Sequence, residues 1–183
     1  MDCQFLFCVE TDKRARTDEI YIKETLNRFF EAIPNTVRIG FIFMHGKSNY
    51  NSDATKGEIR KLTQMFRKNG KTVVMYCIDT DKYESNQNHK RELEEIQRFC
   101  TERDYELIWF CHDVEEVYIG HSVADAEKKD IAETFKRREM IKDADIANFS
   151  SETMAKNKSN IICVLKKYFI LRDENKKRRG QTR

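Results

Sequence analysis

The chain has 183 residues, of which 36% are charged and 39% are hydrophobic. This length suits one domain of ordinary size, and the hydrophobic share is enough for a packed core. The net charge of +3 is too small to establish a polyanionic partner, so the positions of the charges must decide. We expect one domain over residues 4–172, with a core over 4–125 and a helical part over 126–172, followed by a basic, disordered tail over 173–183.

Targeting signals and metal motifs are both missing from the sequence. The N-terminus has an acid at Asp2 and a short apolar run that ends at Glu10, unlike a signal peptide, and no apolar segment approaches the ~18 residues of a membrane span. The six cysteines include no Cys-x-x-Cys pair and have no histidine at the spacing of a structural zinc site. We therefore expect a soluble, cytoplasmic protein with reduced thiols, no structural zinc and no membrane association.

Four short apolar runs predict strands at residues 4–9, 37–44, 72–78 and 106–110. Their apolarity is continuous rather than alternating, which is typical of strands covered on both faces in a parallel sheet. Helical periodicity fills the intervals and ends at Pro34, at Asn69–Gly70 and just before the fourth run. This alternation predicts a Rossmann-like, three-layer α/β sandwich around a central, mainly parallel sheet.

Beyond residue 110 the pattern predicts extra C-terminal helices. A short helix is expected over 114–119, a charged helix over about 123–141, and an amphipathic helix around 161–169, whereas 143–160 is rich in Ser, Asn and Ala and predicts a loop. The last helix packs on the sheet by default, although its apolar face could instead support a homodimer.

Acidic side chains follow the predicted strands. Glu10 ends the first run, Asp79 and Asp81 end the third, and Glu115 follows the fourth. In an open parallel sheet the ligand crevice lies outside the carboxyl ends of the strands. Two aspartates one residue apart at a strand end would present their carboxylates on the same side, where their repulsion calls for a cation. Hard carboxylate oxygens favour Mg²⁺ or Mn²⁺ as that cofactor, and no organic cofactor is predicted.

A metal site of this kind would orient a phosphodiester, polarise its oxygen and activate a water for in-line attack. Lys82, beside the aspartates, and Lys13, Arg14 and Arg16, after Glu10, could hold the phosphate backbone. The sequence therefore favours a metal-dependent nuclease that acts on RNA, such as tRNA, or on DNA. The competing interpretation is that the aspartates are polar residues that merely end a strand.

Three segments resemble the motifs of Toprim-like proteins of the RloB-like type. The apolar run ending at Glu10, followed by Thr17–Tyr21 at the start of the first helix, resembles the opening motif of that family. The Asp-x-Asp at Asp79–Asp81 is similar to its second motif, and His112–His121 resembles a third, in which Glu115 is one matching residue and the final His another. The resemblance covers residues 4–125.

This resemblance implies a role for each matching residue. Glu10 would act as general acid or base or as a metal ligand, Glu115 would supplement it, and Asp79 and Asp81 would hold magnesium. It also implies a nuclease effector of bacterial antiphage defence that works with an ATPase partner. Thr11 stands where the family has Gly, which keeps open a second hypothesis: a non-catalytic Toprim-like adaptor or sensor that binds a protein partner.

Two other motifs resemble those of known enzyme classes. Gly46-Lys47-Ser48 is similar to the end of a P-loop, but Phe41 stands where the required earlier glycine would be. An aspartate pair also occurs in haloacid-dehalogenase phosphatases, where it lies on the first strand rather than the third, and in metal-dependent glycosyltransferases.

Overall fold

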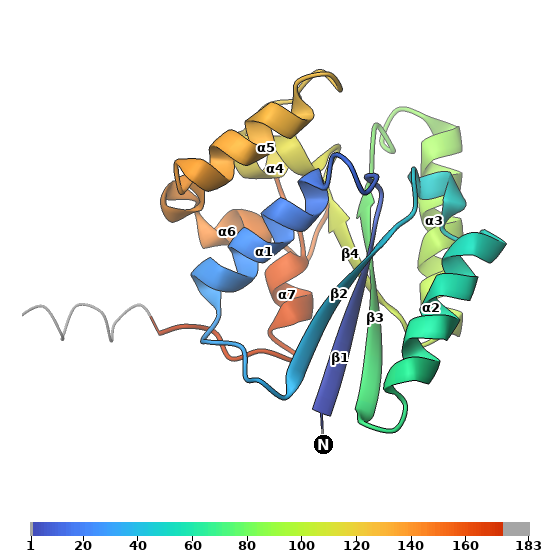
Figure 1. The fold of residues 1–183 in the computed structure, drawn as a ribbon. Helices are drawn as coiled ribbons and strands as arrows, with labels where there is room; N and C mark the ends of the chain where they lie inside the picture. The colour runs from blue at the N-terminus through green and yellow to red at the C-terminus, as the bar shows by residue number, and fades with distance from the viewer. Residues whose placement is uncertain (1, 174–183) are drawn as a thin grey trace, which may run out of the picture.

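The computed structural model describes residues 2–173, and a four-stranded parallel sheet runs through its centre (Figure 1). The strands are β1 (Asp2–Val9), β2 (Val37–Phe43), β3 (Gly70–Asp79) and β4 (Glu106–Phe110), and their order across the sheet is β2-β1-β3-β4. The predicted four strands and their parallel arrangement are confirmed. The predicted basic tail lies mostly outside the described residues.

Helices cover both faces of this sheet and complete a Rossmann-like three-layer sandwich (Figure 1). One face carries α2 (Asp53–Phe66), preceded by the 3₁₀ turn η1 (Lys47–Asn49), and α3 (Gln87–Glu102). The other face carries α1 (Thr17–Phe29), α4 (Val114–Ile119), α5 (Lys128–Arg137), η2 (Met140–Asp143), α6 (Ile146–Phe149) and α7 (Ile161–Leu165). Within residues 2–173, no helix combines the length and the apolar character needed to cross a membrane.

The continuous apolar runs arise because both faces of the sheet are buried. On β1, Phe5, Phe7 and Val9 belong to the larger core under α1, whereas Leu6 and Cys8 belong to the smaller core under α2 and α3. Strand side chains alternate between the two faces, so each face requires its own apolar set. The central strands therefore read as unbroken hydrophobic segments.

The strand order creates a switch point between β1 and β3. The chain leaves β1 through α1 on one face to reach β2, then crosses back through α2 on the other face to reach β3. At such a reversal the two connections diverge and leave a crevice outside the carboxyl ends of the two strands. Glu10 follows β1 and Asp79 ends β3, so both acids lie at this crevice.

Two C-terminal helices are shorter than the sequence predicts. The charged helix was expected from about Val123 but begins at Lys128, because the hydroxyl of Ser122, the natural N-cap for a start at Val123, donates to Glu116 Oε1 at 3.0 Å instead. Helix α7 ends at Leu165, after which the chain tightens into i→i+3 hydrogen bonds. The predicted loop over 143–160 contains the short helix α6.

Asn160 closes the outer edge of β4. Its side-chain amide donates to Leu107 O at 3.0 Å and accepts from Trp109 N at 2.8 Å, so it occupies the position of a neighbouring peptide group. The adjacent Ser159 Oγ donates to Trp109 O at 2.7 Å. Unpaired backbone groups at a sheet edge are costly when buried and invite pairing with other chains. This segment therefore satisfies the edge without adding a strand.

Replacing Asn160 with Ala should therefore destabilise the fold. Trp109 N–H and Leu107 C=O would lose their partners, and we expect the free energy of unfolding to fall by about 1–3 kcal/mol. Urea denaturation monitored by circular dichroism would measure the change. Asn88→Ala, on the exposed side of α3, is the matched control, expected within about 0.5 kcal/mol of wild type. Equal effects of the two substitutions would contradict the edge-closing role.

Candidate functional site

A hydrogen bond joins the ends of the two central strands. Asp79 N donates to Glu10 Oε1 at 2.7 Å, which fixes the Glu10 carboxyl directly across the switch point. Both residues are half-buried. The sequence prediction that these acids converge at the carboxyl edge of the sheet agrees with this placement.

Asp18 adds a third carboxyl to the crevice. It lies buried in the first turn of α1, and its Oδ2 accepts from the backbone N–H groups of Glu10 at 3.0 Å and Thr11 at 3.2 Å. These bonds fold the loop after β1 back toward the start of α1. Sequence reasoning did not select Asp18 as a site residue, because an acid in a first helical turn is ordinarily explained by the helix dipole.

Glu115 supplies a carboxyl from the other side of the crevice. It lies in α4 with no exposed surface, and Lys128 Nζ, at the start of α5, is 3.3 Å from its Oε2. Neither oxygen accepts a well-formed hydrogen bond. A fully enclosed side chain does not touch a substrate, so the arrangement favours a positioning role for Glu115 over the predicted catalytic one.

Burial raises the pKa of each of these acids. Burial is the main cause for Glu10, whose pKa rises to about 8 against the opposing Asp79 N–H, with the Asp18 charge adding to the rise. The pKa of Asp79 is well above its usual value because of burial and the charges of Glu10, Asp18 and Glu115. Burial also raises the pKa of Asp18, and that of Glu115 to about 7. The ionised forms of these four carboxyl groups are therefore disfavoured in the metal-free chain.

Two lysines face the acidic group from opposite sides. Lys47, in η1, donates to Asp79 O at 3.2 Å and pairs with the Asp81 carboxylate. Burial opposes its charged form, but the Asp81 hydrogen bond and charge outweigh that cost and raise the pKa of Lys47. Burial likewise opposes the charge of Lys128, whose pKa nevertheless rises because of Glu115 and Asp79. Sequence reasoning considered Lys47 within the rejected P-loop motif and gave no role to Lys128, which has no motif to mark it.

Asp81 departs from the strand geometry that the sequence prediction assumed. Strand β3 ends at Asp79, and Asp81 has a φ of 49°, in the left-handed region. The alternation of side chains therefore stops before Asp81, whose carboxylate is 42% exposed and faces Lys47. Lys47 therefore contacts both aspartates, Asp79 at its carbonyl oxygen and Asp81 at its carboxylate.

A basic groove adjoins the acidic crevice. It lies between α1 and α5, has a volume of about 630 Å³, and is lined in part by Arg14, Arg16, Lys129 and Lys136. Both helices begin at the crevice, since Asp18 is in the first turn of α1 and Lys128 is the first residue of α5. The groove therefore starts near these helix ends, and its lining includes more basic than acidic side chains.

The predicted phosphate-binding residues are divided among different surfaces. Arg14 and Arg16 line the groove, although Arg16 forms a bidentate pair with Glu19 at 2.7 Å. Lys13 lines a separate hollow beside β2 and α2, and Lys82 is exposed in the turn after Asp81. Only part of the predicted basic set therefore lies beside one path.

The donor atoms at the crevice suit a hard divalent cation. Glu10, Asp18 and Asp79 offer carboxylate oxygens, and no thiol or imidazole is hydrogen bonded to them among the described residues. Oxygen donors of this kind match Mg²⁺ or Mn²⁺. The raised pKa values also favour a bound cation, because its positive charge would stabilise the ionised carboxylates.

These pKa shifts predict a stability that falls with rising pH. Between about pH 5 and 8 the folded chain keeps a proton on Glu10 that the unfolded chain has released, so the free energy of unfolding decreases across this window. Glu10→Gln retains an acceptor for Asp79 N–H but cannot ionise. We expect the variant to be more stable than wild type at pH 8, with the gap narrowing toward pH 5, in urea denaturation with EDTA present.

Glu94→Gln, on the exposed face of α3, controls for the loss of a carboxylate elsewhere. A gap between Glu10→Gln and wild type that stayed constant from pH 5 to 8 would contradict the raised pKa of Glu10.

Comparison with known proteins adds no relatives to this description. No protein-family model, no curated protein and no solved structure matches the chain. The geometry and charges of the crevice therefore carry the functional argument.

Proposed function

We propose that this protein is a metal-dependent nuclease whose site is the acidic crevice between β1 and β3. The observation that carries the proposal is the convergence of Glu10, Asp18 and Asp79 at the carboxyl edge of the sheet, where burial raises all three pKa values and neighbouring acids add to the rise for Glu10 and Asp79. Such crowding costs stability, and arrangements of this kind are found preferentially at functional sites. A divalent cation is the ligand that best offsets it.

Asp79 and Glu10 are the residues that would hold Mg²⁺ or Mn²⁺. When bound, the ion would polarise a phosphodiester and lower the pKa of a coordinated water. Asp18 fixes the approach of Glu10 by accepting the Glu10 N–H at 3.0 Å. These contacts keep the ligands in place before any substrate arrives, so little reorganisation is required.

Glu10 is a metal ligand in this proposal, because a bound ion would favour its ionised form, whereas its pKa of about 8 applies to the metal-free chain. Lys47, which donates to Asp79 O at 3.2 Å, is placed to contact a phosphate oxygen at the same edge. Lys128, held by Glu115 at 3.3 Å, supplies positive charge on the opposite side.

The groove between α1 and α5 supports a nucleic acid as substrate. A polyanion would follow its basic side chains, of which Arg14 and Arg16 lie in the loop between Glu10 and Asp18. Glu19, Glu24 and Glu133 also line the groove, which favours contact with the backbone at a few phosphates over a uniformly charged track. Both RNA and DNA meet this requirement.

The first test is nuclease activity of Asp79→Asn beside wild type, on plasmid DNA, single-stranded DNA and total tRNA with Mg²⁺ or Mn²⁺. A metal contributes several kcal/mol to such a reaction, so we expect cleavage to fall by at least about a thousandfold while the circular dichroism spectrum stays unchanged. Asp53→Asn, on the exposed first turn of α2, is the matched control and should cleave at the wild-type rate. Wild-type activity in Asp79→Asn would refute the proposal.

The second test concerns the groove. Arg14→Ala combined with Lys129→Ala removes two charges that would contact phosphates. We expect this double variant to bind nucleic acid more weakly under conditions without cleavage. Its binding constant should also depend less steeply on salt concentration, by about two released counterions. Fluorescence anisotropy with labelled RNA or DNA at several salt concentrations would measure both. Lys68→Ala with Lys71→Ala, at the opposite end of β3, is the control. Equal salt slopes for the two double variants would place the nucleic acid elsewhere.

A second candidate function is a non-catalytic adaptor or sensor. The pairing of Lys47 with Asp81 and of Lys128 with Glu115 favours it, because both lysines already supply cations to the acids. Calorimetric titration separates the two functions. Binding of Mg²⁺ or Mn²⁺ that is lost in Asp79→Asn supports the nuclease, whereas no heat of metal binding supports the adaptor.

A further inference from the structure

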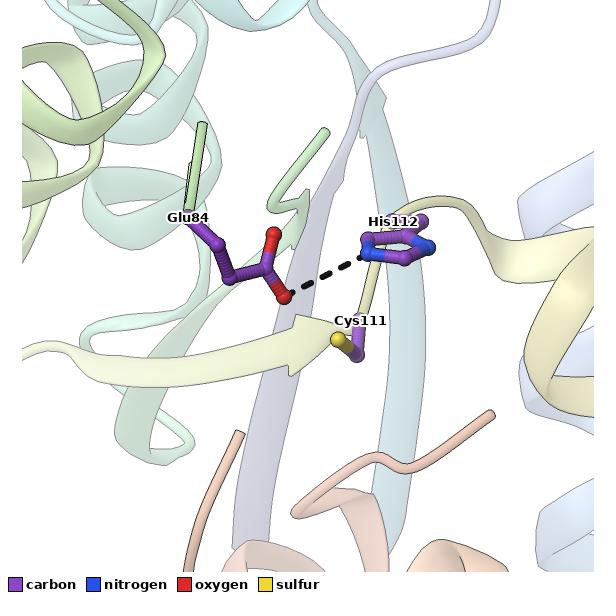
Figure 2. A group of neighbouring side chains, drawn as sticks. All are labelled: Glu84, Cys111 and His112. Atoms are coloured by element: carbon purple, nitrogen blue, oxygen red, sulfur yellow. Dashed lines mark hydrogen bonds and ion pairs between the residues drawn. The ribbon is translucent and has the colours of Figure 1, made fainter. Parts of the chain in front are cut away.

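A second group of metal-binding side chains lies at the ends of β3 and β4. Glu84, Cys111 and His112 each offer one ligand atom, and these atoms all lie within 4.8 Å of one another. Figure 2 shows the Glu84 carboxylate pointing toward the His112 ring, with the Cys111 sulfur beside them. Glu84 comes from the loop between β3 and α3, and the other two residues directly follow β4.

Backbone hydrogen bonds hold the two segments together. Thr80 N donates to Phe110 O at 2.9 Å, Asp81 N donates to His112 O at 2.9 Å, and His112 N donates to Thr80 Oγ1 at 2.9 Å. On its other side, Cys111 N donates to Lys158 O at 2.9 Å. His112 has a φ of 64°, a left-handed conformation that is rare outside Gly and persists only where the surroundings enforce it. The donor group is therefore preorganised.

The His112 ring has a carboxylate at each nitrogen. Its Nδ1 is 2.7 Å from Glu116 Oε2, and its Nε2 is 3.3 Å from Glu84 Oε1. A neutral imidazole carries only one N–H, so it can donate to only one of these carboxylates. The shorter contact assigns the proton to Nδ1. The Nε2 lone pair then faces the Glu84 oxygen, an arrangement that a cation between Nε2, the carboxylate and the thiol would make favourable.

Glu116 holds the ring nitrogen of His112 that faces away from the proposed metal ligands, as a carboxylate usually does for a histidine that binds a metal. Its Oε1 accepts from Ser122 Oγ at 3.0 Å, and its backbone N–H donates to Asp113 Oδ1 at 2.7 Å, so the carboxylate that orients His112 is itself fixed. A carboxylate on the far nitrogen sets the tautomer and raises the basicity of the ligating nitrogen. The same Ser122 contact delays the start of α5.

We propose that Glu84, Cys111 and His112 bind a divalent transition-metal ion, with Zn²⁺ as the best match. A thiolate, an imidazole and a carboxylate together favour a borderline ion over Mg²⁺, and three protein ligands leave a fourth position for water. The side chains of Glu84 and His112 are 47% and 27% exposed, which gives the ion a route from solvent. Binding releases the Cys111 thiol proton to water.

Motif spacing does not reveal this group. Cys111 and His112 are adjacent in sequence, and Glu84 lies on a different loop, so no zinc-finger pattern exists to be found. The three residues meet only because β3 and β4 are neighbours in the sheet. The prediction against a structural zinc site rested on spacing alone and does not address a site built across two strand ends.

Cobalt substitution tests the proposal on the full chain. Co²⁺ should produce the near-ultraviolet band of a cysteine thiolate bound to cobalt, and added Zn²⁺ should abolish it. Cys111→Ser should lose the band. Glu84→Gln, at an exposed position, should bind Co²⁺ and Zn²⁺ at least about tenfold more weakly. A loss of about tenfold is already typical for a residue that only hydrogen bonds to a metal ligand, and a ligand itself should matter at least as much. Cys163→Ser, a thiol outside the group, is the matched control.

The outcomes separate this site from the acidic crevice. Asp79→Asn should keep the cobalt band, so failure of the nuclease would leave this proposal standing. The proposal is overturned if wild type gives no thiolate band, or if Glu84→Gln and Cys163→Ser bind the ion equally well.

Discussion

The hydrogen bond from Asp79 N–H to the Glu10 carboxyl ties together the ends of β1 and β3, where the chain reverses its direction across the sheet. It brings one acid to the backbone of another, and Asp18 then closes the loop by accepting the Glu10 N–H. Repulsion among these groups explains why lysines approach from η1 and from α5. The loops at this edge are arranged around that accumulated negative charge.

Much of the scaffold follows from local patterns in the sequence. The strands were predictable because burial on both faces requires unbroken apolar runs, and Glu10 and Asp79 were predictable because parallel strands end at the same edge. The positions of Asp81 and Lys128 were not. Asp81 turns into a left-handed conformation through pairing with His112, and Lys128 reaches Glu115 only after α5 packs beside α1. These are long-range contacts that no local pattern encodes.

One short loop serves both groups of potential ligands. Asp79 ends β3 at the acidic crevice, and Glu84 extends from the same connection toward Cys111 and His112. The donors nevertheless differ in kind, since carboxylate oxygens surround the crevice whereas sulfur and nitrogen are present beside Glu84. The loop between β3 and α3 thus links two regions with different chemical preferences.

The closed edge at β4 also affects which border of the sheet a strand from another chain could join. Asn160 satisfies the outer backbone groups of β4, whereas β2, at the opposite border, hydrogen bonds to β1 alone. A strand from another chain would have to displace Asn160 to join β4, whereas no side chain among residues 2–173 pairs with the outer backbone groups of β2 in the same way. Arg38, an exposed charge on β2, is the kind of residue that discourages such unwanted joining. An incoming strand would therefore meet a side-chain amide at one border of the sheet and a charged side chain at the other.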